Sequence, residues 1–177
     1  LKDQLSASVG PHQYGVSMSL GLERLLYEVQ HTHEQREMDL FLIDASDAFC
    51  CLGRTFLNQC VAQSCPALQG FANWLLPKRI NAFLATNHPE PKCADVTIGV
   101  LQGAVESALL FALAMRGILD NLMIDLSGKS TIITPWAYLD DLTLAVPPEH
   151  ADQVWDCLQS HMNAAGLEVN TNKLRIL

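Results

Sequence analysis

Two strand-like segments joined by only three residues constrain the fold of this 177-residue chain more than any other feature. Residues 131–138 and 142–146 are rich in apolar and β-branched side chains, and Leu139, Asp140 and Asp141 link them. So short a link joins neighbouring antiparallel strands, and the pattern therefore predicts a β-hairpin with an acidic turn. Adjacent carboxylates at such a turn repel one another, and their charge is costly unless a bound cation neutralises it.

Helical and strand-like patterns alternate irregularly around this hairpin. Apolar residues recur at helical spacing in segments 17–30, 47–61, 68–84 with a break at Pro77, 103–122, and 148–165, where Gly166 is placed to act as a C-terminal cap. Strand-like patterns occupy 38–43, 96–100 and 167–177, whereas 1–12, 31–37 and 87–92 indicate loops or polar breaks. This alternation predicts an α+β fold, and the length suffices for one domain rather than two.

Composition excludes several classes of protein. Only 17% of the residues are charged, which excludes an intrinsically disordered acidic tail. The 19 acidic against 11 basic residues, a net charge of −8, disfavour a nucleic-acid binder that works through composition alone. No uninterrupted apolar run approaches about 18 residues and no signal peptide opens the chain, so we expect no membrane partner and an intracellular location, nucleus or cytoplasm.

Two further features concern thiols and completeness. The six cysteines include no CxxC pair, which favours free or buried thiols in a reducing compartment over disulfides or zinc. The first residue is Leu1 rather than Met, so we expect the chain to be a piece of a longer polypeptide.

A third carboxylate, Asp44, follows the apolar segment 38–43. If that strand lies beside the hairpin, Asp44 converges with Asp140 and Asp141. Magnesium accepts carboxylate oxygens and keeps open positions for phosphate, and three such acids suit a two-metal site. The alternative is two solvated turn aspartates and one strand-end aspartate without a common ligand.

Five motifs, taken in order, resemble those of the reverse transcriptase family. The central three are Asp44-x-x-x-Ala48-Phe49, Gln102-Gly103 leading to Ser107-x-Leu109-Leu110-Phe111, and Tyr138-x-Asp140-Asp141. Gln13-Tyr14-Gly15 precedes them, and the segment from Gly166 to Lys173 is similar to a fourth palm motif that ends in lysine. The resemblance spans the chain from about residue 11 to the end. Within the family, the motifs are most similar to those of the polymerases of non-long-terminal-repeat retrotransposons and group II introns.

The resemblance implies a polymerase palm with part of the fingers, and no thumb, over residues 1–177. Its antiparallel sheet would place residues 38–44 beside the hairpin, backed by the helices at 103–122 and 148–165. The implied activity is that of an RNA-directed DNA polymerase. The implied partners are an RNA template, a DNA primer, deoxynucleoside triphosphates, and the remaining fingers and thumb of the parent polypeptide.

The resemblance also assigns roles to the acidic residues and to a lysine. Asp44 and Asp140 would carry two Mg²⁺ ions, with Mn²⁺ as a substitute. Asp141 would be a supporting ligand, and the carbonyl oxygen of Ala45 would complete the metal shell. Lys173 matches the lysine proposed to protonate the pyrophosphate leaving group, and the alternative is a surface lysine in a salt bridge.

Other matching positions concern the nucleotide. Phe49 would exclude a 2′-hydroxyl and so select deoxynucleotides, while Gln102 and Gly103 would shape the floor beneath the nascent base pair. Glu106 departs from the Pro-Leu-Ser-Pro sequence that usually follows Gln-Gly in the family, and it adds a negative charge near the expected path of the nucleic acid. This departure keeps open a catalytically degenerate, palm-like scaffold that binds RNA or protein. An RNA-dependent RNA polymerase is a third reading, against which Phe49 and Leu139 argue.

Overall fold

The computed structural model describes residues 2–78, 80–84, 92–129 and 131–177. Its central feature is a four-stranded antiparallel sheet in the order β5-β6-β1-β8. The strands are β1 (Asp39–Ile43), β5 (Thr134–Tyr138), β6 (Asp141–Val146) and β8 (Arg175–Ile176). The predicted hairpin and the predicted pairing of the first strand with it are both confirmed.

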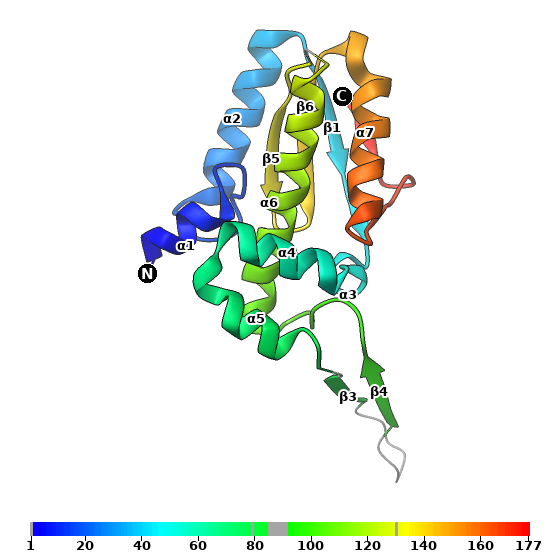
Figure 1. Ribbon diagram of the computed structural model, residues 1–177. Coiled ribbons are helices and arrows are strands. Elements are labelled where there is room, and N and C mark those ends of the chain that lie inside the picture. Colours follow the sequence, from blue (N-terminus) through cyan, green and yellow to red (C-terminus); the bar gives the residue numbers. More distant parts are fainter. Residues whose placement is uncertain (1, 79, 85–91, 130) are drawn as a thin grey trace.

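Helices surround the sheet (Figure 1). They are α1 (Lys2–Val9), α2 (Gly21–Arg36), α3 (Ala48–Cys51), α4 (Arg54–Ser64), α5 (Gln69–Leu75), α6 (Val105–Ser127) and α7 (Ala151–Ala164), with 3-10 turns at Pro66–Leu68 and Pro148–His150. Two small ribbons complete the fold: β2 (Ala45–Ser46) pairs with β7 (Glu168–Val169), and β3 (Ile80–Leu84) pairs with β4 (Lys92–Val96).

The two faces of the sheet pack against different helices because side chains alternate along each strand. Phe41 and Leu144 belong to the main core, which the apolar residues of α6 and α7 share. Leu40 and Trp136 point to the opposite face, where residues of α2 cover a smaller apolar cluster. The fold is therefore α+β, with an antiparallel sheet backed by α6 and α7 as the sequence predicts.

Helix α6 is the core helix of this arrangement. The helix contains no uninterrupted apolar run of membrane-spanning length. Its length and its mean hydropathy of 1.5 are nevertheless sufficient for it to cross a membrane. Its residues Phe111, Leu113, Ile118 and Leu122 are fully buried inside the protein. A mostly buried helix that packs between α4, α7 and the sheet needs no lipid to cover its apolar surface.

Helix α7 ends as predicted at Gly166. The N–H of Gly166 donates to the carbonyl of Asn163, and the N–H of Leu167 donates to that of Met162. This is a Schellman motif, and Gly166 supplies the positive φ of 82° that it requires. The chain is thereby turned back, so that β7 pairs with β2 and β8 pairs with β1.

Several predicted elements are wrong. The helix predicted over 68–84 stops at Leu75, just before Pro77, and the chain continues as β3. The strand predicted over 96–100 ends at Val96, because the chain then turns to reach Gly99. The final strand is divided into β7 and β8, and the helix predicted over 47–61 is divided at Gly53.

Two expected irregular segments are helical. Residues 2–9 form α1, whose Val9 is buried. Helix α2 includes the polar residues 31–34 and ends at Arg36. A helix that exposes most of its surface can hold such a polar turn. The loop predicted over 87–92 lies outside the described residues except for Lys92, which belongs to β4.

Candidate active site

A cavity of about 420 Å³ opens beyond the end of β1. It is lined by Asp44, Ala45, Ser46, Asp47, Ala48, Phe49, Cys50, Gln102, Asp140, Asn170 and Lys173. Six of the eight residues that the sequence singles out therefore meet in one place. Asp141 lines a neighbouring cavity of about 440 Å³ instead, which it shares with Asp44 and Lys173. Gly103 lies next to Gln102 in the chain and lines neither cavity.

Strand pairing places the three aspartates together. Ile43 lies opposite Leu142 in the antiparallel register, so Asp44 and Asp141 are the next facing positions and Asp140 occupies the adjoining turn. The pKa of Asp141 is raised by partial desolvation and by the charges of Asp140 and Asp44, against which Lys173 acts. The predicted convergence of these carboxylates at one end of the sheet is thus present in the fold.

The three carboxylates are near one another, but their oxygens are not arranged to bind one metal ion together. Within the described part of the chain, the three aspartates do not bring one oxygen each within 4.8 Å of one another. The ammonium of Lys173 instead lies 3.0 Å from Oδ2 of Asp44. An all-oxygen donor set at the mouth of an open cavity nevertheless fits a hard divalent cation, which takes six or more oxygens and keeps waters.

The turn that carries Lys173 is fastened to the end of β1. The N–H of Asn170 donates to the carbonyl of Asp44 over 2.8 Å, and the N–H of Lys173 donates to the carbonyl of Asn170 over 3.0 Å. The Lys173 side chain is 64% exposed. An ion pair this exposed contributes little stability, so the lysine can leave Asp44 at small cost.

Phe49 stands between the cavity and the core. Its ring stacks on that of Phe111, with centroids 4.6 Å apart and planes 21° from parallel. Phe111 is fully buried, whereas Phe49 is half-buried and lines the cavity. The aromatic ring is therefore held in place from behind while its other side is available to a bound molecule.

The loop before α6 forms another wall of the cavity. The N–H of Val100 donates to the carbonyl of Phe49, and Gly99 adopts a φ of +67° as it crosses α3 closely. Gly103 has a φ of +91° and no neighbouring atom near the position of a Cβ. This positive φ favours glycine at the position, and the role of Gly103 beneath a base pair stays a prediction.

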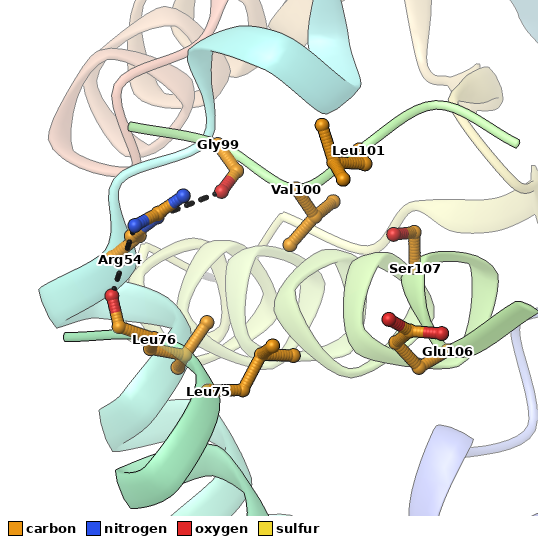
Figure 2. Close-up of a pocket in the computed structure, with 8 residues that line it drawn as sticks. All are labelled: Arg54, Leu75, Leu76, Gly99, Val100, Leu101, Glu106 and Ser107. Carbon is orange, nitrogen blue, oxygen red and sulfur yellow. Dashed lines mark hydrogen bonds between the residues drawn. The ribbon is translucent and has the colours of Figure 1, made fainter. Parts of the chain in front are cut away.

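Arg54 holds this loop against the end of α5 and the β3–β4 ribbon (Figure 2). Its guanidinium donates to the carbonyl oxygens of Gly99 (2.9 Å), Leu76 (3.0 Å), Lys78 (2.7 Å) and Val96 (3.3 Å). A single planar fork with five donors suits such a cluster of acceptors. Arg54 is therefore a brace between backbone segments.

Figure 2 also locates Glu106, the acidic departure from the family pattern. Its side chain lines a small apolar pocket with Arg54, Val100 and Ser107, and it does not line the 420 Å³ cavity. The negative charge expected beside the nucleic acid therefore lies at a separate pocket, which has only about 20 Å³ of free space.

Gln13 is a positioning residue whose role the sequence did not reveal. Its Oε1 accepts hydrogen bonds from the N–H groups of Leu139 (2.8 Å) and Gly15 (2.9 Å), and Nε2 lies 3.4 Å from the carbonyl of Leu139. Leu139 has a φ of +57° and directly precedes Asp140. A buried amide thus holds the acidic turn in a backbone conformation that leucine rarely adopts.

Gln13→Leu should lower the free energy of unfolding by about 1–3 kcal/mol, because it leaves the partly buried N–H groups of Gly15 and Leu139 without their acceptor. In a domain of this size, the melting temperature falls by roughly 2–4 °C per kcal/mol. The matched control is Gln30→Leu on α2, whose exposed amide donates to Glu34. Equal melting temperatures for the two variants in thermal unfolding would show that Gln13 does not brace the turn.

Comparison with known proteins gives a family and a fold. A family model described as reverse transcriptase (RNA-dependent DNA polymerase) matches residues 1–177. No curated protein sequence matches the chain. Among solved structures, apo telomerase from Candida tropicalis truncated from its C-terminal domain is similar with a TM-score of 0.64 and 11% identity, over 88% of this chain and 34% of that chain.

Other telomerase structures are equally similar. Telomerase from Candida albicans in complex with the TWJ fragment of telomeric RNA has a TM-score of 0.62 and 13% identity, over 99% of this chain and 34% of that chain. A further apo telomerase from Candida tropicalis has a TM-score of 0.65 and 10% identity, over 88% of this chain and 31% of that chain. The chain thus spans about a third of the length of these structures and shares their fold.

Proposed function

The chain belongs to the reverse transcriptase (RNA-dependent DNA polymerase) family, and on that premise we propose that it is the palm, with part of the fingers, of an RNA-directed DNA polymerase of a retroelement. It extends the 3′-hydroxyl of a DNA primer on an RNA template, inside the cell, in the nucleus or cytoplasm. The observation that carries this proposal is the meeting of Asp44, Asp140, Phe49 and Gln102 around one open cavity.

Metal ions belong to this proposal because the family generally uses divalent cations. Asp44, Asp140 and the carbonyl oxygen of Ala45 would hold two Mg²⁺ ions, with Asp141 as a supporting ligand and Mn²⁺ as a substitute. Such ions supply charge neutralisation at phosphate and activation of an attacking oxygen. The raised pKa of Asp141 supports this assignment, since crowded carboxylates gain most from a bound cation.

The remaining cavity residues have roles that their chemistry supports. Lys173 is exposed, so it would leave Asp44 at small cost and donate its proton to a departing pyrophosphate oxygen. The amide of Gln102 offers a donor and an acceptor beneath a base pair. With a net charge of −8, the chain supplies few phosphate contacts, so basic finger and thumb segments of the parent polypeptide would hold the duplex.

Primer extension by the polypeptide that contains this chain tests the proposal. The assay offers a DNA primer on an RNA template, with deoxynucleotides or ribonucleotides and with Mg²⁺ or Mn²⁺. We expect DNA synthesis that chelation of the metal abolishes. Binding of the primer–template without incorporation under every condition would instead support a palm-like scaffold, and incorporation of ribonucleotides alone would support an RNA polymerase.

Phe49→Ala should raise the incorporation of ribonucleotides relative to deoxynucleotides by about 10–100-fold, because it removes the ring that excludes a 2′-hydroxyl. The matched control is Phe56→Ala on α4, a half-buried ring that packs on the same core but does not line the cavity. The measurement is the ratio of kcat/KM values for the two nucleotides. An unchanged ratio in Phe49→Ala would contradict the role of Phe49 in sugar selection.

A further inference from the structure

A second group of potential metal ligands lies between α6 and α7, apart from the proposed polymerase cavity. Asp125 is near the end of α6, and Cys157 and His161 are one turn apart on α7. One ligand atom of each lies within 4.8 Å of the others, and within the described residues this is the only such group of three. Nε2 of His161 is 2.9 Å from Oδ2 of Asp125.

The chemistry of this set differs from that of the polymerase site. A thiolate, an imidazole and a carboxylate are the three donor types that bind Zn²⁺, and hard ions such as Mg²⁺ prefer oxygen alone. Cys157 and His161 are four residues apart, so they lie on the same face of α7 and turn toward the same neighbour. Three protein ligands leave one tetrahedral position for water or a fourth donor.

The burial of the three side chains suits a metal that enters from solvent. Cys157 is buried, the His161 side chain is 18% exposed, and the Asp125 side chain is 54% exposed. Burial raises the pKa of the Cys157 thiol, and a cation that binds its thiolate must displace the proton. The charge of Lys129 faces the same thiol and acts in the opposite sense on its pKa.

A simpler reading is a His161–Asp125 hydrogen bond beside an unrelated thiol. That reading accounts for the 2.9 Å contact, and the helical spacing accounts for the sulfur near His161, but neither accounts for the sulfur within 4.8 Å of Asp125. Cysteine spacing conceals the group, because its ligands come from two helices and include one cysteine only. The absence of a CxxC pair favours free thiols over zinc, but it carries no information on this contact between two helices.

We propose that Asp125, Cys157 and His161 bind one Zn²⁺ ion that fastens α6 to α7. The ion replaces the direct Asp125–His161 hydrogen bond and is coordinated by the Cys157 thiolate, the His161 imidazole, the Asp125 carboxylate and one further ligand. Helix α6 follows Gln102 in the chain, and α7 leads through Gly166 toward Lys173. The bound ion therefore stabilises the packing of α6 on α7. These two helices are connected in the chain to residues on both sides of the 420 Å³ cavity.

Cobalt substitution tests the proposal on the metal-free polypeptide that contains this chain. Titration with Co²⁺ should produce a thiolate-to-cobalt charge-transfer band and visible bands of a tetrahedral ion. In Cys157→Ser these bands should lose one equivalent of intensity, whereas the matched control Cys65→Ser, a buried cysteine that follows α4 and lines neither cavity, should retain them. Identical spectra for the wild type and Cys157→Ser would overturn the site.

Variants at the other two ligands guard against a folding defect in Cys157→Ser. Asp125→Asn and His161→Gln should each weaken Zn²⁺ binding by more than about 10-fold, measured by competition with a chromophoric chelator. Zn²⁺ should also raise the melting temperature of the wild type and fail to raise that of either variant. Equal zinc affinity or equal zinc-dependent stabilisation in wild type and both variants would refute the proposal.

Discussion

Asp140→Asn should reduce primer extension by the polypeptide that contains this chain by more than about 100-fold. Outer-shell residues at metal sites already contribute about 10–100-fold to affinity or activity, and a direct carboxylate ligand contributes more. The substitution keeps the size of the side chain and removes one negative charge from the cavity that Asp140 and Asp44 both line. Single-nucleotide incorporation at saturating Mg²⁺ measures the loss.

Its matched control is Asp156→Asn, the same chemical change at an exposed position of α7 outside both cavities. This control should retain full incorporation, and both proteins should bind the primer–template and melt at similar temperatures. Incorporation by Asp140→Asn within a few-fold of the control would contradict the assignment of Asp140 as a metal ligand. It would also remove the main support for catalysis at this cavity.

Gly99→Ala should destabilise the domain by about 2–4 kcal/mol and lower its melting temperature by roughly 5–15 °C. A Cβ atom at this position would overlap the carbonyl oxygens of Phe49 and Cys50, which are backbone atoms of α3. The φ of +67° adds strain for any residue with a side chain. The loop or α3 must shift to relieve the overlap, so activity should fall with stability.

Two other glycines separate the causes of this effect. Gly103→Ala introduces the same kind of positive-φ strain, at +91°, into open space, so it should cost about 1–2 kcal/mol. Gly70→Ala lies in helix α5 with nothing near the new methyl group, so it should be neutral or stabilising by up to about 1 kcal/mol. Chemical denaturation measures all three, and equal stabilities of Gly99→Ala and Gly103→Ala would show that no overlap occurs at Gly99.

Local pattern and short-range geometry were sufficient to predict the elements that form the site. The three-residue link between two apolar segments required a hairpin, and Asp44 at the end of a third segment then had to lie near its turn. Long amphipathic or apolar repeats likewise predicted α6 and α7. These features depend on neighbours in the chain or on simple strand pairing, and the structure confirms them.

The missed features depend on contacts between distant segments. Gln13 acts through Leu139, 126 residues away, and nothing in the sequence around Gln13 indicates that partner. Arg54 acts through carbonyl oxygens, which every residue has, so no side-chain pattern can reveal them. Residues 80–84 form a strand because β4 pairs with them, although their composition is compatible with a helix. The ligand roles of the aspartates stay predictions.

The brace made by Arg54 joins four backbone segments without using an opposite charge. All four acceptors that the structure gives it are neutral carbonyl oxygens, contributed by the end of α5, Lys78, the end of β4 and the loop at Gly99. The end of the β3–β4 ribbon and the wall of the cavity are therefore held together through one side chain. None of these acceptors ionises, so the brace does not depend on the protonation of a second side chain.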